Sequence, residues 1–193
     1  MGPGQALTLP ACRRPDRRAS CASAAAASIT AILALNAGPH APTLTSLIAG
    51  AGLVALAVTD AATHRLPATE VRLLAGLTAV SMIGAAWWHD EWGPPLRAFV
   101  GAALLAVLLV SLWLALPGAF AFGDVKVTVI AFAAAAAISW RAGAVMIIVA
   151  CVIGGVAALI ARGTRRHLAP VQLTIPFVPG LALGFVVGVM VPW

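Results

Sequence analysis

The scarcity of charge along this chain limits its fold more than any other feature of the sequence. Lys and Arg number 12 and Asp and Glu number 6 among 193 residues, and 62% of the residues are apolar. A soluble domain of this size cannot hide so much apolar surface from water. The sequence therefore argues against a soluble enzyme or a disordered chain and predicts a polytopic membrane protein. Charge is absent from residues 19–59, 73–89, 98–123, 127–140, 142–161 and 167–193.

Seven stretches have the length and apolar character of membrane-spanning helices. Residues 38–42, Gly-Pro-His-Ala-Pro, divide the first charge-free stretch in two. Strands are not expected, because Ala, Leu and Gly dominate and apolar and polar residues do not alternate. We expect an all-α, polytopic transmembrane helix bundle of about six to seven spans, with residues 1–19 as a basic polar tail and 20–193 as one membrane domain. The candidate spans are residues 20–37, 43–60, 70–88, 96–117, 124–140, 142–161 and 174–192.

The first candidate span has a second interpretation. Its basic start, its apolar run and the small residues in Ala34-Leu35-Asn36-Ala37 are also typical of a cleavable signal peptide. In either case the chain begins its next span, near residue 43, on the outer side of the membrane. The orientation expected for the later spans does not depend on this choice.

The net charge of +6 reflects membrane orientation rather than nucleic-acid binding. With a cytoplasmic N-terminus and alternating spans, ten basic residues fall inside and only Arg97 and Arg141 fall outside, which is a strong positive-inside bias. Most Trp residues fall near the outer boundary, as in an aromatic belt. We expect a multi-pass protein of the cell (inner or plasma) membrane, with anionic lipid as a partner and no nucleic acid. The inner basic residues are Arg13, Arg14, Arg17, Arg18, Arg65, Arg72, Lys126, Arg162, Arg165 and Arg166.

Metal and redox chemistry find no support in the sequence. The three Cys residues form no CxxC pair, and the four His residues are scattered over loops on both sides. Phosphate-binding glycine loops and the known hydrolase motifs are also missing. We therefore expect neither a metal nor a cofactor.

Two of the six acidic residues carry the functional argument. Asp60 ends the second span and Asp124 opens the fifth, so the expected topology brings both to the cytoplasmic face at similar depth. Two carboxylates at a half-dry boundary cannot easily both ionise, so one keeps its proton while the other stays an anion. Such a pair can deprotonate a water molecule and protonate a leaving amine, which is the chemistry of an aspartic protease.

Each aspartate also has a purely structural explanation. Asp124 follows a glycine and precedes a helix, so it could be an N-cap. Asp60 could be a charge at a helix end that pairs with Arg65 or Lys126. Gly180, Gly184 and Gly188 lie on one face of the last span, where close helix packing is their expected role.

Three motifs in this chain resemble those of the type IV prepilin peptidases, integral-membrane aspartic proteases of the GxGD class. Asp60 is followed seven residues later by Pro67, in Leu66-Pro67 where the family has Ile-Pro. Residues 121–126, Ala-Phe-Gly-Asp-Val-Lys, are similar to the family's Gly-x-Gly-Asp-Val-Lys, and residues 175–184 are similar to its third signature. The motifs occur in family order and cover residues 60–184. The resemblance implies that Asp60 and Asp124 are catalytic, with Gly123, Lys126 and Pro67 as supporting loop residues.

The resemblance also implies a substrate, a pilin-like precursor whose basic leader is cut at the cytoplasmic membrane face. Ala121 replaces the first glycine of the second motif and lacks the freedom of glycine at positive φ. The family's larger members carry a paired-cysteine segment and methylate the new N-terminus. This chain resembles the short, peptidase-only form, so we expect no methyltransferase activity. The competing functions are a small polytopic transporter and a catalytically inactive scaffold of pilus or secretion assembly.

Overall fold

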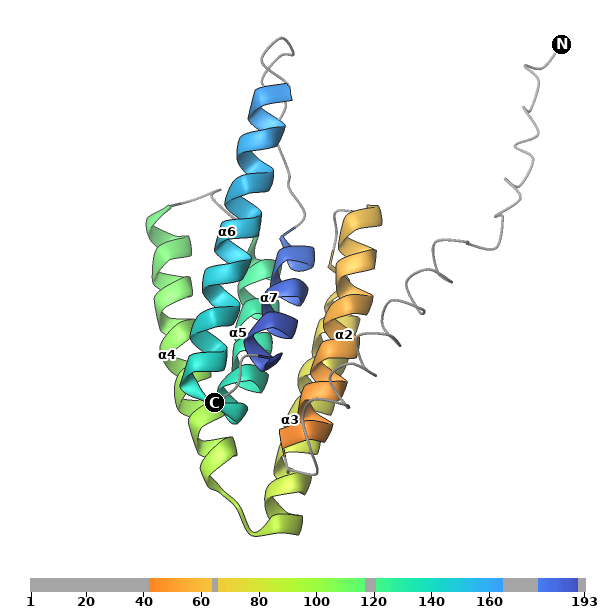
Figure 1. Ribbon diagram of the computed structural model, residues 1–193, viewed down its shortest axis with the longest axis vertical. Coiled ribbons are helices and arrows are strands. Elements are labelled where there is room, and N and C mark those ends of the chain that lie inside the picture. The colour runs from red at the N-terminus through yellow and green to blue at the C-terminus, as the bar shows by residue number, and fades with distance from the viewer. Residues whose placement is uncertain (1–41, 64–65, 117–120, 165–176, 191–193) are drawn as a thin grey trace, which may run out of the picture.

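The computed structural model describes residues 42–63, 66–116, 121–164 and 177–190, and these residues form helices joined by short connections (Figure 1). The described part of the chain contains no strand, which agrees with the expected all-α class. The predicted first span, residues 20–37, lies outside the described residues. The helices are α2 (Pro42–Thr63), α3 (Ala68–His89), α4 (Gly93–Ala115), α5 (Phe122–Ile138), α6 (Trp140–Thr164) and α7 (Val178–Met190).

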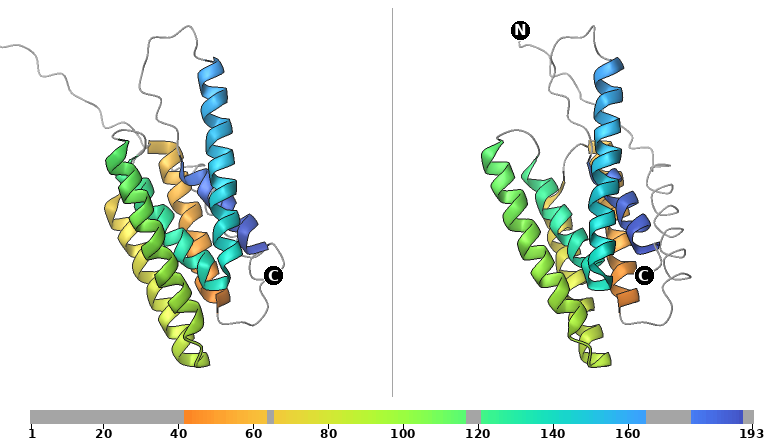
Figure 2. Two further views of the ribbon diagram at one scale, coloured as in Figure 1. Left: turned by 90° about the vertical axis from the view of Figure 1, so that its left-hand side faces the viewer. Right: turned by 60° about the vertical axis from the view of Figure 1, so that its left-hand side comes forward.

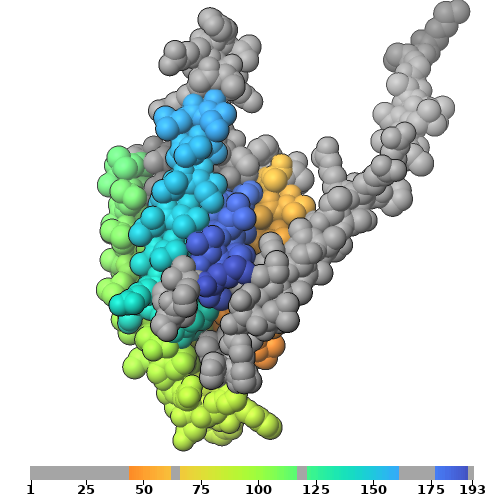
Figure 3. Space-filling model, in the orientation of Figure 1, coloured from red at the N-terminus to blue at the C-terminus, as the bar shows by residue number. Residues whose placement is uncertain are grey.

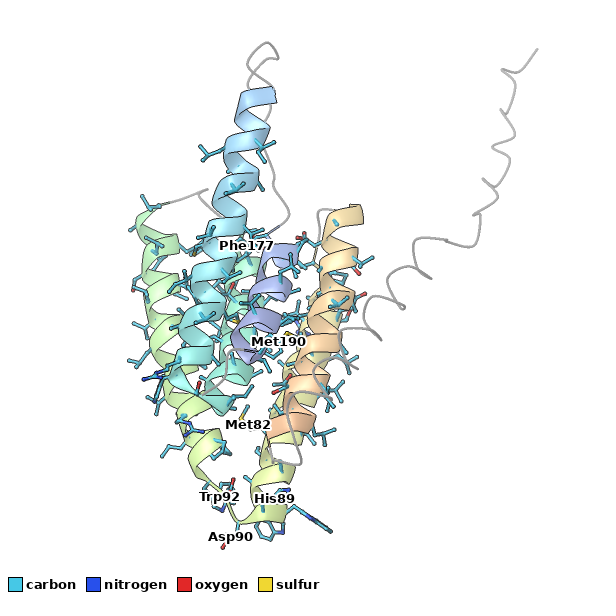
Figure 4. The ribbon with its side chains drawn as sticks, in the orientation of Figure 1. Met82, His89, Asp90, Trp92, Phe177 and Met190 are labelled. Atoms are coloured by element: carbon cyan, nitrogen blue, oxygen red, sulfur yellow. The ribbon has the colours of Figure 1, made fainter. Side chains whose placement is uncertain are left out.

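Successive helices run in opposite directions, so the bundle has two ends (Figures 1 and 2). At the upper end of Figure 1, α2, α4 and α6 finish and α3, α5 and α7 begin. At the lower end lie the α3–α4 and α5–α6 connections, and Figure 4 places His89, Asp90 and Trp92 there. Because Asp60 is near the end of α2 and Asp124 near the start of α5, both aspartates belong to the upper end.

Helix α5 is the centre of the bundle. It packs against α2, α3, α4, α6 and α7, and its alanines at 131 and 134–137 are fully or almost fully buried. Alanine lets the neighbouring helices approach closely, as small residues do in membrane proteins. The short helix α7 lies between α6 and α2, as the space-filling view shows (Figure 3).

Among the described residues four helices are long and apolar enough to cross a membrane, which indicates a membrane protein: Leu44–Ala61, Ala68–His89, Gly93–Ala115 and Trp140–Ile160. The expected count of six to seven spans is not confirmed. Helix α5 has 17 residues and α7 has 13, so they measure about 26 Å and about 20 Å, less than the ~30 Å hydrocarbon layer. Both are largely enclosed by the longer helices, whereas α4 and α6 expose apolar side chains along most of their length.

The glycine face of α7 packs directly on α6, as the sequence predicts. A Cβ on Gly184 would collide with the carbonyl oxygen of Met146, and one on Gly188 would lie 2.6 Å from that of Ala142. A Cβ on Gly180 would lie 3.4 Å from the carbonyl oxygen of Ala150. The backbones of α6 and α7 therefore touch, which leaves no room for a side chain at Gly184 or Gly188.

The lower end carries exposed tryptophans and a partly buried polar contact made by Arg97. Trp87, Trp88, Trp92 and Trp140 are all exposed there, as an interfacial aromatic belt requires. Arg97 points inward instead, and its Nη2 donates to the carbonyl oxygens of Ala137 at 2.8 Å and Ile138 at 3.2 Å. These carbonyls end α5 and have no partner within the helix, so Arg97 caps α5 from α4.

Candidate active site

Asp60 lies in the last turn of α2 and is buried, with 6% of its surface exposed. Its Oδ2 accepts a hydrogen bond of 3.4 Å from the backbone N–H of Val178, the first residue of α7. A buried carboxylate needs such donors, because burial strips it of water. The contact joins two segments that are 118 residues apart in sequence and brings the third motif onto the first.

Asp124 lies in the first turn of α5 and is half-buried. Its N–H donates to the carbonyl of Ala121 at 3.0 Å, and its own carbonyl accepts a hydrogen bond of 2.6 Å from the Thr128 hydroxyl. The N-cap of α5 is Ala121, so the interpretation of Asp124 as an N-cap is wrong. The carboxylate of Asp124 therefore does not serve as the cap of its own helix.

The fold brings Asp60 and Asp124 close enough for the charge of one to act on the other. They come from different helices, α2 and α5, which pack against each other. Two carboxylates that interact in a partly dry environment each make it harder for the other to ionise. A pair of acids of this kind has the chemistry required of a general acid and a general base.

Position 121 does not need glycine in this fold. Ala121 has φ −77° and ψ 145°, an extended conformation that any residue adopts. The concern that alanine distorts the loop at this position therefore does not apply to this backbone. Gly123, in contrast, is in close contact, since a Cβ there would lie 3.3 Å from Cδ1 of Leu66.

The Leu66–Gly123 contact joins the first motif to the second. Leu66 packs against the apolar core at the upper end, beside the start of α5. Pro67 follows it as the N-cap of α3, with φ −63°, and its carbonyl accepts the N–H of Val71 at 3.2 Å. Pro67 therefore fixes the point at which the chain turns from the site into α3.

Lys126 lies at the rim of the site and points to an aromatic ring. Its side chain is exposed, and Nζ lies 4.7 Å from the centroid of the Phe122 ring. The Phe122 ring in turn contacts Trp113 of α4, with ring centroids 5.3 Å apart. These contacts connect the end of α4 with the start of α5, so Lys126 helps to stabilise the segment that carries Asp124.

Sequence reasoning missed two participants, the Val178 N–H and the Trp113 ring. A backbone donor leaves no mark in side-chain chemistry, and Trp113 resembles any other apolar residue of its span. Arg65, which the sequence offers as a possible partner of Asp60, lies outside the described residues. Within residues 42–63, 66–116, 121–164 and 177–190, no three His, Cys, Asp or Glu side chains are grouped so that they could hold a metal ion.

Comparison with known proteins adds no relative to this picture. No protein-family model matches the chain, no curated protein matches it, and no solved structure matches it. The functional argument therefore depends on the two aspartates and the contacts around them.

Proposed function

We propose that this protein is a membrane-embedded aspartic endopeptidase that removes the leader peptide of pilin-like precursors. The observation that carries the proposal is the meeting of three separate segments at one end of the bundle. Asp60 contacts Val178, Leu66 contacts Gly123, and Asp60 and Asp124 act on each other electrostatically. These are the segments in which the sequence resembles the prepilin peptidases.

The proposed reaction uses the two carboxyl groups as a general acid and a general base. The ionised carboxylate removes a proton from a water molecule, which attacks the carbonyl carbon of the scissile peptide. The protonated carboxyl group first donates to the carbonyl oxygen, and a proton then passes to the leaving amine as the C–N bond breaks. Because both groups exchange protons with each other and with the substrate, the dyad acts as a unit. The chemistry needs no cofactor, and methyl transfer is not part of the proposed activity.

In this proposal the upper end of the bundle faces the cytoplasm of a bacterial cell. Support comes from the basic residues, since ten of the 12 Lys and Arg residues fall on that side in the expected topology. Asp60 and Asp124 then lie at the inner membrane boundary, where the leader of a precursor meets its hydrophobic helix. The partners are the precursor and anionic membrane lipid.

The decisive experiment is leader cleavage by Asp60→Asn and Asp124→Asn proteins co-expressed with a pilin-like precursor from the same genome. Each variant should lower cleavage by at least about 10⁴-fold, because a single missing proton-transfer group disables such a dyad. Glu70→Gln is the matched control, since it removes an exposed acid from the first turn of α3 at the same end of the bundle. Mass spectrometry of the precursor reports the cut.

Normal processing by Asp124→Asn would refute the mechanism. A wild-type protein that co-purifies with the precursor and leaves it uncut would instead favour an assembly scaffold.

A further inference from the structure

The start of α7 cannot satisfy its own backbone. The first N–H groups of a helix have no partner within it, and a buried helix start needs acceptors from elsewhere. Phe177 precedes α7 and has no side-chain oxygen, while its carbonyl takes the Leu181 N–H at 3.2 Å. Pro179 has no N–H to satisfy. The N–H groups of Val178 and Gly180 remain, and Val178, at the very start of the helix, is fully buried, so water does not supply its acceptor.

Asp60 supplies that acceptor from a different helix. Its Oδ2 takes the Val178 N–H at 3.4 Å, in the place where an N-cap side chain would normally stand. An aspartate is favoured at the start of a helix for two reasons. Its oxygen accepts the free N–H, and its negative charge faces the positive end of the helix dipole. The same contact holds the Asp60 carboxylate in one position.

The position of α7 along α6 determines whether the hydrogen bond between Asp60 and Val178 can form. Gly184 and Gly188 let α7 lie directly against the carbonyls of Met146 and Ala142 on α6. If α7 slid along α6 or moved away from it, this contact would be lost and a gap would open between the two helices. At 3.4 Å the N–H···O distance is already long for a hydrogen bond. A small displacement of α7 is therefore enough to break it.

We propose that Asp60 of α2 caps the start of α7. The glycine face of α7 fixes the position of α7 along α6, and the start of α7 in turn positions the Asp60 carboxylate. Val178 is then a positioning residue that acts through its backbone. The consequence for catalysis rests on the proposed function, whereas the cap itself does not.

Hydrogen exchange of the full-length protein in lipid nanodiscs tests the cap without any substrate. Asn accepts the N–H as well as Asp does, whereas Ala does not. In Asp60→Ala the amides of Val178, Gly180 and Leu181 should exchange about fivefold faster than in wild type, and in Asp60→Asn they should stay within about twofold of wild type. Equal exchange in the two variants, fast or slow, would overturn the proposal. Since no cleavage is measured, this result is independent of whether the protein is a peptidase.

Substitution of the glycine face tests the link to Asp60. Gly184→Ala should accelerate exchange at the start of α7 and lower kcat for precursor cleavage by about 10-fold to 100-fold with KM unchanged. Gly155→Ala on α6 is the matched control, because a Cβ there meets nothing within 4 Å. If Gly184→Ala does not fold, Gly180→Ala should give a smaller change in the same direction, since its Cβ would make only ordinary contact. A loss of kcat without faster exchange at α7 would contradict the proposed link.

Discussion

Replacement of Arg97 by Leu tests the packing of the bundle independently of any function. Arg97 Nη2 donates to two carbonyls at the end of α5, at 2.8 and 3.2 Å. Hydrogen bonds from a charged donor each contribute about 1.5–3 kcal/mol, and two that share one nitrogen contribute less than twice that. Within the described part of the chain the Nε of Arg97 is buried without a partner, and its removal returns about 1 kcal/mol. We therefore expect Arg97→Leu to lower the free energy of unfolding by about 2 kcal/mol.

The assay is unfolding by SDS in mixed micelles, followed by tryptophan fluorescence. Arg141→Leu is the matched control, because it removes the same charge from an exposed position at the same end of the bundle. We expect it to change stability by less than about 0.5 kcal/mol. Arg97→Lys should fall between the two, since an ammonium keeps the charge at the helix end but cannot reproduce the guanidinium geometry. Equal losses for Arg97→Leu and Arg141→Leu would refute the capping role.

Three further substitutions have expected outcomes. Ala121→Gly should leave precursor cleavage within about twofold of wild type, because the extended backbone there does not use the freedom of glycine; a large gain in rate would show that the loop adopts a different conformation during catalysis. Lys126→Met should lower cleavage only several-fold, since the loss is one cation–π contact of about 1 kcal/mol with Phe122, and a loss as large as that of Asp124→Asn would contradict a purely supporting role. Ser139→Ala should lower the free energy of unfolding by about 1 kcal/mol in the same SDS titration, because its hydroxyl accepts the Ala142 N–H at 3.0 Å and caps α6; unchanged stability would argue against that cap.

Helix positions were largely predictable from the charge-free stretches. The span expected at 70–88 is α3, Ala68–His89, and the one at 142–161 is α6, Trp140–Thr164. The physical reason is that a charge is costly inside a membrane, so charges gather where helices end. The last span was expected at 174–192, and within the described residues α7 extends from Val178 to Met190.

Helix burial was not predictable in the same way. A helix that faces lipid and a helix that is enclosed by protein are both apolar, so hydrophobicity does not separate α5 and α7 from α4 and α6. The role of Arg97 could not be predicted either. Its position between two charge-free stretches indicated only the orientation of the chain in the membrane. Its contact with Ala137 depends on how α4 and α5 pack, which no local pattern encodes.

The candidate site was predictable at its side chains and not at its backbone. Asp60 and Asp124 were singled out because acids are rare in this chain, and the fold places both at one end. The donor to Asp60, the Val178 N–H, was not foreseen, since every residue except proline offers the same group.

A single residue, Ser139, joins α5 to α6. Helix α5 ends at Ile138 and α6 begins at Trp140, and Ser139 bonds to both, through its N–H to Ala135 and its hydroxyl to Ala142. A joint of one residue leaves α5 and α6 little freedom to change their relative direction, and α7 is packed on α6 through its glycines. Asp124 is carried by α5, and the Asp60–Val178 hydrogen bond joins α2 to α7. The two aspartates are therefore connected through Ser139, α6 and α7 as well as by the direct packing of α2 on α5.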